Sequence, residues 1–513
     1  MKQTSNIIVA LLYIVLFIAL FPYFKYLIDT DGISYINQAT RYANNSLAGS
    51  VNGYWSPLSS WVLVPFIKIG YEPVITAKII NGILGLASLL SCISLLNKFH
   101  IHPRLKKILA YAFLLLLLSF CFYELCADLL LVFLLSLYFN IVLKKDFINN
   151  NKQLASAAVL GGLCYFSKAY FFPFFLLHIS IVLFLLCKKE YGRKLMKPFL
   201  VKMAIVFTVF LLIVFPYLYL LNKKYNTVLI STAGKLNSTW FLAPGFNDDS
   251  SIAIVPPYKE AMSSWDEPVY KKEKTVSAFD SKELFVKQLK LAAYNTKEFS
   301  KLLLNISFFS FFILAGFLYY LFKRKKQTTV QEQLLFITML LLPAGYLLVI
   351  IEWRYIWMLS ILLLIAGSIV LTKLASEKTI NIGGLVVAAS FAFYPITELL
   401  KLSNSNKDVY GMAAAFKTNN IKGNFYIDGS TQKKLAKASV LCYLTGNKLL
   451  GVYKTNYTKE EWQASLIQYN IKYYVGFYET EEEKLKEQQS FMAKNALRIY
   501  DNLYPGVLLY QLK

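Results

Sequence analysis

Residues 7–35 read IIVALLYIVLFIALFPYFKYLIDTDGISY, an apolar run that ends at two carboxylates, Asp29 and Asp31. A helix needs about 20 apolar residues to cross the hydrocarbon core of a bilayer, and this run is long enough. It has no small-residue cleavage site, so we expect a retained membrane anchor rather than a signal peptide that is removed. Carboxylates at the mouth of a membrane span are costly unless they meet water, a cation or a substrate. The two acids therefore mark the first candidate for a functional site.

The composition extends this membrane pattern to most of the chain. Of 513 residues, 56% are hydrophobic and only 16% are charged. In soluble domains about a quarter of the residues are charged. Apolar runs predict an α-helical polytopic membrane protein with about eleven transmembrane helices, near 7–27, 74–96, 106–122, 125–143, 154–170, 171–187, 200–221, 301–322, 333–351, 355–373 and 380–399. Gly161, Gly162 and Pro173 predict that the fifth span is interrupted and forms a tight or re-entrant pair with the sixth.

The net charge of +24 indicates how the chain is oriented in the membrane and does not indicate a nucleic-acid partner. Basic residues gather in short connections between apolar runs, such as 98–107, 188–197 and 323–326. This is the positive-inside pattern of cytoplasmic loops, and no basic-aromatic nucleic-acid module accompanies it. We therefore expect no nucleic acid as a partner. The protein should be a multi-pass protein of a plasma membrane (a bacterial inner membrane) with a cytoplasmic amino terminus.

Three external segments follow from this orientation. Residues 29–73 and 222–300 form long loops, and the second is predicted to end in a helix over 282–296. After Lys401 the composition changes, with predicted strands at 424–428 and 471–477 and predicted helices at 430–445 and 459–469. The expected domains are a transmembrane domain over 1–400 and a small extracytoplasmic α/β domain over 401–513. About 110 residues suffice for a core of its own.

Further polar side chains come from separate parts of the apolar sequence, and all fall on the external side. Glu124 and Asp128 open the predicted fourth span on one helical face, about 6 Å apart along the axis. Lys168 lies at the end of the fifth span, and Arg354 follows Glu352 between the ninth and tenth. Convergent acids and cations predict a site for an anionic substrate beside a carboxylate base.

Each of these residues also has a purely structural interpretation. Asp29 or Asp31 could cap a helix, and Glu124 could complement the dipole of the fourth span. Lys168 could extend its ammonium to the membrane interface, and Arg354 could pair with Glu352 or with an acid of the fourth span. Only their shared location favours a common function.

The order and spacing of these motifs resemble those of the polytopic GT-C glycosyltransferases, the superfamily of protein O-mannosyltransferases and aminoarabinose transferases. The resemblance covers about residues 1–400. Residues 31–35 (DGISY) are similar to the acidic motif after the first span, with Gly32 where a second acid is usual, and residues 54–58 (YWSPL) to the Pro-Pro-Leu segment. The stretch 124–128, Lys168 and the pair 354–355 are similar to the acidic, lysine and Arg-Tyr motifs.

The resemblance implies a glycosyltransferase (hexosyl or pentosyl, EC 2.4-type). It would move a sugar from a polyprenyl-phosphate donor, reached from the membrane lipid, to an extracytoplasmic acceptor that is a lipid, glycan or protein. Asp31 would be the catalytic base, and Lys168 and Arg354 would hold the phosphate. The full set of implied substrate-binding residues is Asp29, Tyr35, Trp55, Glu124, Asp128, Lys168, Arg354 and Tyr355. No cofactor and no metal site are expected, with a divalent metal left open.

Two other functions stay open at the level of the sequence. A transporter or flippase of lipid-linked saccharides would show broken helices at mid-depth and inverted repeats, and only Gly161-Gly162 offers such a break. A polymerase or ligase would use the same kind of donor with a different acceptor.

Overall fold

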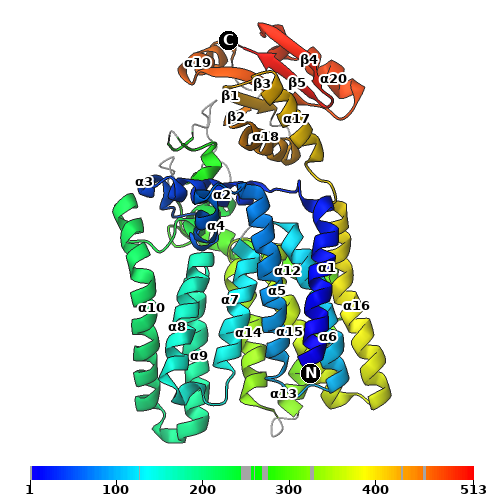
Figure 1. Ribbon diagram of the computed structural model, residues 1–513. Coiled ribbons are helices and arrows are strands. Elements are labelled where there is room, and N and C mark those ends of the chain that lie inside the picture. The colour runs from blue at the N-terminus through cyan, green and yellow to red at the C-terminus, as the bar shows by residue number, and fades with distance from the viewer. Residues whose placement is uncertain are drawn as a thin grey trace.

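The computed structural model describes residues 3–125, 127–243, 256–258, 260–268, 275–323, 328–428, 431–453 and 458–512. Most of the predicted basic loop 323–326 and part of the external loop 222–300 lie outside these ranges. Long helices form a bundle, and a small mixed sheet lies beyond one end of it (Figure 1). The amino terminus is at the far end of the bundle from the sheet, and the carboxyl terminus is in the sheet domain.

A described helix overlaps each of the eleven predicted spans. They are α1 (Gln3–Phe24), α5 (Pro73–Leu96), α6 (Pro103–Tyr123), α7 (Ala127–Val142), α8 (Asn151–Ser167), α9 (Phe171–Tyr191), α10 (Met196–Tyr225), α13 (Ser310–Lys323), α14 (Val330–Leu347), α15 (Trp357–Leu374) and α16 (Glu377–Lys401). Among the described residues, eight helices are long and apolar enough to cross a membrane, or nine if one bent pair is a single span. The helical polytopic membrane fold is thus confirmed, with fewer full-length spans than the sequence predicts.

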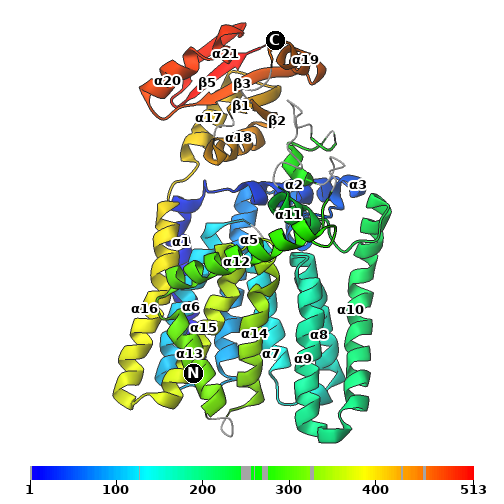
Figure 2. The same ribbon diagram turned by 180° about the vertical axis from the view of Figure 1, so that it is seen from behind.

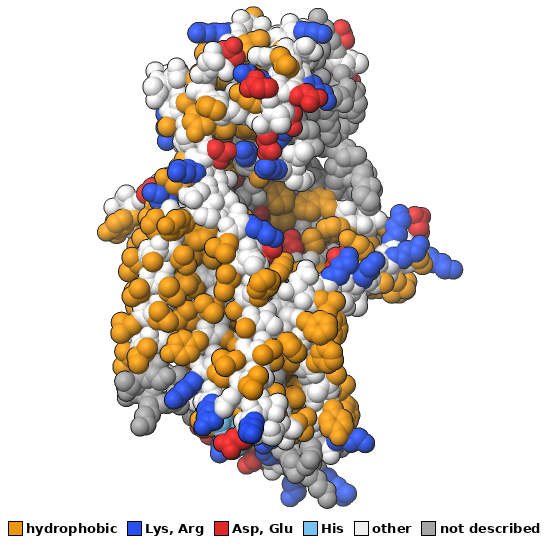
Figure 3. All heavy atoms as spheres, turned by 90° about the vertical axis from the view of Figure 1, so that its right-hand side faces the viewer, with side chains coloured by type: hydrophobic (Ala, Val, Ile, Leu, Met, Phe, Trp, Pro, Cys, Tyr) orange, Lys and Arg blue, Asp and Glu red, His pale blue; other side chains and the backbone are white. Residues whose placement is uncertain are grey.

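The bundle is built around α15, which is buried along most of its length. Trp357 at its start stacks on Phe120 of α6, with ring centroids 4.4 Å apart. Peripheral helices turn apolar side chains outward instead: Leu11 and Ile18 of α1 and Phe393 of α16 are each more than half exposed. Figure 3 shows the result, a broad hydrophobic belt over the helical body. Such a belt is what a lipid-facing surface requires.

The predicted interruption of the fifth span is wrong, because α8 continues through both glycines. A Cβ atom on Gly161 would lie 2.4 Å from the Phe175 ring, and one on Gly162 would lie 2.6 Å from the Ile213 side chain. The two glycines therefore permit close packing of α8 against α9 and α10. A short turn joins α8 to α9, so the expected tight pair is present without a break in the helix.

The predicted start of the eighth span at residue 301 is also wrong. Helix α12 (Lys282–Ile306) extends beyond the predicted 282–296 and meets α13 at an angle of 99°. Figure 2 shows α12 lying across the bundle near the end that carries the sheet domain. The Asn295 side chain holds it there, donating to the carbonyls of Leu347 and Val349 at 3.0 and 3.1 Å. Residues 301–306 therefore belong to α12, although the apolar run that begins at residue 301 predicted a membrane span there.

The same end of the bundle carries a layer of shorter helices. The expected external loop 29–73 contains α2 (Thr30–Ala43), α3 (Leu47–Ser50) and α4 (Leu58–Lys68), and α11 (Ala233–Leu242) lies beside α12 (Figure 2). We call this end of the bundle the upper end.

The carboxyl-terminal part is a small α/β domain, as predicted. Its elements are α17 (Lys407–Thr418), β1 (Asn424–Asp428), α18 (Gln432–Thr445), β2 (Lys448–Tyr453), α19 (Lys459–Gln468), β3 (Ile471–Phe477), α20 (Glu481–Gln488), α21 (Phe491–Lys494), β4 (Arg498–Tyr504) and β5 (Val507–Gln511). The sheet order is β2-β1-β3-β5-β4, with β1 parallel to β2 and β3 and the other pairs antiparallel. Apolar residues of α17 and α18 share a buried cluster with α2, which fixes the domain on the upper end.

Candidate active site

Five separate segments meet at the upper end, and four of them carry the predicted polar residues. They are the first turn of α2, the α6–α7 junction, the end of α8, the end of α14, and the 3-10 turn η6 (Trp353–Ile356). Figure 3 shows acidic side chains in a recess between the hydrophobic belt and the sheet domain. The site therefore forms where the helices open toward the carboxyl-terminal domain.

Arg354 is the centre of the cluster. Its Nη2 lies 2.8 Å from an Asp31 oxygen, its Nη1 lies 2.7 Å from Glu124, and its Nε lies 2.8 Å from Glu352. Asp128 is 3.9 Å from the same Nε. The Arg354 side chain is only 13% exposed, so burial strengthens the Coulomb attraction to these acids and also removes hydration from them. The structural interpretation of Arg354, pairing with acids, is thus correct in this state.

Lys168 is connected to the same cluster through Asp128. The residue caps the end of α8, and its ammonium forms an ion pair with the buried Asp128 carboxylate. That ammonium also lies 3.8 Å from the centre of the Tyr355 ring, a cation–π contact. The Lys168 ammonium is therefore directed at the cluster. Lys168 and Arg354 both lie beside the Asp128 carboxylate, so the two cations are close to each other. We call this pair the joint cationic group.

Tyr346, at the end of α14, is a member of this site that the sequence did not reveal. Its ring stacks on Tyr355 with centroids 4.4 Å apart, and the Lys168 ammonium lies 5.8 Å from its centre. The buried Tyr346 hydroxyl has no hydrogen-bond partner among the described residues. A buried hydroxyl without a partner is costly, so this one is available to a ligand.

Asp29 caps helix α2 and bonds it to the α6–α7 junction. One carboxylate oxygen accepts from the Gly32 N–H at 2.8 Å and caps α2, and the other accepts from the Leu125 N–H at 2.9 Å. A Cβ on Gly32 would lie 2.8 Å from the Leu125 side chain and 2.9 Å from Asp29. This crowding leaves no room for a side chain at position 32.

An aromatic cluster adjoins Asp31 on the side away from Arg354. The Trp265 indole N–H donates to the second Asp31 oxygen at 3.2 Å. Trp55 donates to the Trp265 carbonyl at 2.8 Å and packs edge-on against Tyr35, with centroids 5.3 Å apart. Tyr35 and Trp55 are thus buried and pack in one cluster with Trp265. Sequence reasoning missed Trp265 because 234 residues separate it from Asp31.

Buried ion pairs hold the segment that carries Trp265, residues 260–268. Asp266 pairs with Arg41 of α2 at 2.9 Å, and Glu267 pairs with Lys224 of α10 at 2.9 Å. The Met262 carbonyl accepts from the Leu449 N–H of β2 at 3.0 Å. The sheet domain, α2 and α10 therefore jointly fix the position of Trp265.

Burial alters the charge that the cluster carries. It raises the pKa of Glu124 to about 8, because the loss of hydration outweighs the attraction of Arg354, and nearby Asp29, Asp128 and Asp31 add to the rise. Burial and the neighbouring Asp31 likewise raise the pKa of Asp29. A protonated Glu124 leaves Arg354 with one carboxylate fewer to neutralise it. Across the described ranges no group of three or more metal-ligating side chains could hold a metal ion, and the expectation about cofactors stays a prediction.

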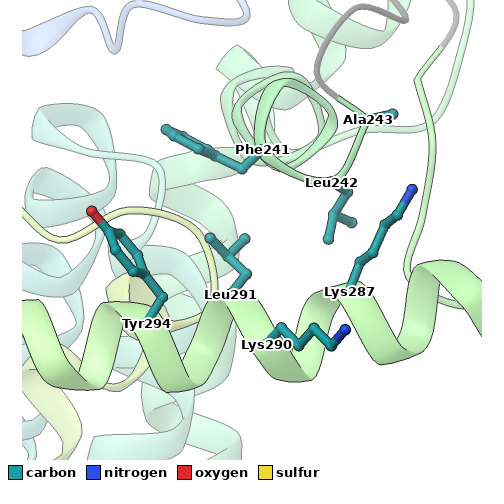
Figure 4. Close-up of a pocket in the computed structure, with 7 residues that line it drawn as sticks. All are labelled: Phe241, Leu242, Ala243, Lys287, Lys290, Leu291 and Tyr294. Carbon is teal, nitrogen blue, oxygen red and sulfur yellow. The ribbon is translucent and has the colours of Figure 1, made fainter.

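A groove lies between α11 and α12. Its volume is about 630 Å³, and its lining residues are Phe241, Leu242, Ala243, Lys287, Lys290, Leu291 and Tyr294 (Figure 4). The apolar side chains face one another across it, and the two lysines lie at one end. An apolar floor with cationic groups at its rim suits an anionic amphiphile.

Comparison with known proteins identifies the class of fold. No protein-family model matches the chain, and no curated protein matches it. Among solved structures, the chain is similar over 100% of its length to 99% of ArnT from Cupriavidus metallidurans bound to undecaprenyl phosphate, with a TM-score of 0.57 and 11% identity. The apo structure of the same protein gives a TM-score of 0.46 and 12% identity over 98% of both chains. The chain therefore shares its overall fold with this ArnT structure, and the fold agrees with the one that its motifs predicted.

The structure gathers most of the predicted site residues. Asp31, Glu124, Asp128, Lys168, Arg354 and Tyr355 meet in one ionic cluster, Tyr35 and Trp55 support the adjoining aromatic rings, and Asp29 caps α2. Their parts in any reaction remain predictions.

Proposed function

We propose that this protein is an integral membrane glycosyltransferase. It moves a sugar from a polyprenyl-phosphate donor to an acceptor on the extracytoplasmic face of a bacterial inner membrane. The observation that carries the proposal is the placement of Asp31 within 2.8 Å of Arg354, and of Arg354 beside the Lys168–Asp128 pair. A base and a joint cationic group thus share one sheltered site in an ArnT-like fold. The structural relative binds undecaprenyl phosphate, which supports a donor of that class.

The donor phosphate would bind to Lys168, Arg354 and the Tyr346 hydroxyl. Arginine offers a planar fork that suits a phosphate, and lysine adds a point charge. Arg354 and Lys168 now bind carboxylates, so the phosphate would displace part of these contacts. The protonation of Glu124 at neutral pH lowers the cost of that exchange.

The chemistry then requires one base and one stabilised leaving group. The Asp31 carboxylate accepts the proton of an acceptor hydroxyl, whose oxygen forms a bond to the anomeric carbon of the sugar. The bond from that carbon to the phosphate oxygen breaks, and polyprenyl phosphate leaves with the bonding electrons. Lys168 and Arg354 stabilise the charge that develops on it. Metal ions are not needed for any of these steps.

The α11–α12 groove supports entry of the donor from the membrane. Helix α12 is amphipathic, with Phe285 and Leu289 exposed on its apolar side and lysines on the other. Through Asn295 it is bonded to the segment that leads into Glu352 and Arg354. Lys287 and Lys290 at the rim of the groove would attract the phosphate of a lipid.

The topology supports an external site. Short basic connections join the helices at the end opposite to the cluster, and this positive-inside pattern supports a cytoplasmic location for that end and for the amino terminus. A transporter is less well supported, because α8 is unbroken and the described bend, between α12 and α13, lies where α12 crosses the upper end.

The test is mass spectrometry of envelope lipids and glycans from cells with and without the gene. Loss of transfer should cause one polyprenyl-phosphate sugar to accumulate and one sugar to disappear from an acceptor. A plasmid copy with Asp31→Asn should not reverse these changes, and a wild-type copy should. Unchanged lipids and glycans in the deletion strain would contradict the proposal.

A further inference from the structure

Three aromatic side chains form a surface beside Asp31 that the proposed chemistry does not use. Tyr54 lies 5.7 Å from Trp265 and 6.1 Å from Trp240, between ring centroids, and Trp240 stacks on Trp265 at 5.9 Å. All three are half-buried. We call these three residues the aromatic surface.

The rings of the aromatic surface are fixed by contacts with Trp55 and with α11. Trp55 is buried under it, with its ring centroid 4.7 Å from Tyr54 and 5.6 Å from Trp265. The Tyr54 hydroxyl donates to Asn237 of α11 at 2.9 Å. Rings fixed in this way lose little conformational entropy when a ligand packs on them.

Asp31 separates the aromatic surface from the cationic group. One carboxylate oxygen faces Arg354 at 2.8 Å, and the other faces the Trp265 indole at 3.2 Å. If the donor phosphate binds on the Arg354 side, the acceptor hydroxyl must reach Asp31 from another direction. The aromatic surface borders the carboxylate on that other side.

The chemistry of the surface fits a sugar ring. A pyranose has a face of C–H groups, which pack on the electron-rich faces of aromatic rings, and a rim of hydroxyls. Sites that combine aromatic walls with a few fixed polar groups bind such molecules. Asp31 and Asn237 supply polar groups at the edges. A polyprenyl tail would gain nothing from a carboxylate at its end.

We infer that the aromatic surface is the acceptor subsite, and that the acceptor presents a sugar ring next to its reacting hydroxyl. This inference rests on the proposed function and narrows it, because it selects a glycan or glycolipid over a protein as acceptor. Trp265 has a second part as a positioning residue, since its N–H orients the Asp31 carboxylate.

The test uses the full-length protein in nanodiscs and four probes: the methyl pyranosides of glucose, galactose, mannose and N-acetylglucosamine. Saturation-transfer NMR should show contact with at least one of them. Trp240→Ala and Trp240→Leu should each weaken this binding fivefold or more. Phe279→Ala removes an exposed aromatic ring elsewhere and should change nothing. Trp265→Phe should retain binding within twofold but slow transfer at saturating acceptor, because it keeps a ring and loses the N–H.

Polyprenyl-phosphate binding is measured on the same samples, which separates two kinds of failure. Pyranoside binding without polyprenyl-phosphate binding would support the subsite and sink the donor assignment. Polyprenyl-phosphate binding with no contact to any of the four pyranosides would overturn the subsite alone. Equal pyranoside binding by wild type and both folded Trp240 variants would overturn it as well.

Discussion

The Arg354 guanidinium and the Asp31 carboxylate lie 2.8 Å apart, although 323 residues separate them along the chain. The same carboxylate accepts from Trp265 on its other oxygen. Asp31 is thus held between a cation and an indole, with both oxygens oriented. Fixed orientation is what a general base needs before its substrate arrives.

Asp31→Asn should reduce sugar transfer by about 100-fold or more, the usual contribution of a general base. The amide oxygen can still accept from Arg354, so the protein should fold and insert normally. The measurement is transfer by purified protein in nanodiscs, with size-exclusion chromatography as the check on folding. Glu482→Gln, a change at an exposed residue of the sheet domain, is the control. Transfer within threefold of wild type would remove Asp31 from the role of base.

Glu124 should make donor binding depend on pH around 8, the value to which burial raises its pKa. As the pH rises through 8 the carboxyl loses its proton, competes for Arg354 and repels the phosphate. Binding of polyprenyl phosphate should therefore weaken between pH 7 and pH 9. Glu124→Gln should bind almost equally at both values. An identical pH profile in wild type and variant would rule out this titration.

The same pKa has a consequence for stability. Because the folded-state pKa lies above the unfolded value of 4.5, the folded protein holds the proton between pH 4.5 and about 8. Stability from this group is fully present below pH 4.5 and decreases as pH rises to about 8. Glu124→Gln should therefore raise the thermal unfolding temperature relative to wild type at pH 9 more than at pH 5, measured by scanning fluorimetry.

The Arg41–Asp266 pair should be important for both stability and activity. Asp266→Asn leaves the buried Arg41 guanidinium without its counter-charge, a loss of about 3–5 kcal/mol for a buried pair. The segment 260–268 should loosen and transfer should fall, since Trp265 no longer fixes Asp31. Lys433→Ala breaks an exposed ion pair of the sheet domain and provides the matched control. Equal thermal stability and activity of the two variants would show that the Asp266 pair does not hold this segment.

The sequence predicted features that depend on local pattern. Apolar runs located the helices, and the strands at 424–428 and 471–477 coincide with β1 and β3. The members of the ionic cluster were found as polar residues at the ends of those runs, because spans that alternate in direction bring alternate ends to one face. Glu352 and an acid of the fourth span were predicted as partners of Arg354, whereas its contact with Asp31, 323 residues away, was missed.

Features that depend on distant contacts were missed. Asn295 bonds α12 to the end of α14 ahead of the bend between α12 and α13, and the glycines of α8 leave room for Phe175 and Ile213. Trp265 reaches Asp31 only because Arg41, Lys224 and the edge of β2 hold its segment. None of these pairings leaves a periodic signal in the sequence.

The central claim is that Lys168 and Arg354 hold the donor phosphate beside Asp31. The most direct measurement is native mass spectrometry of undecaprenyl phosphate bound to wild type, to Asp31→Asn and to the double variant Lys168→Ala/Arg354→Ala. We expect the double variant to bind undecaprenyl phosphate at least tenfold more weakly than wild type. Asp31→Asn should bind it as tightly as wild type or more tightly, because one charge that competes for Arg354 is gone. Undiminished binding by a folded double variant would contradict the claim.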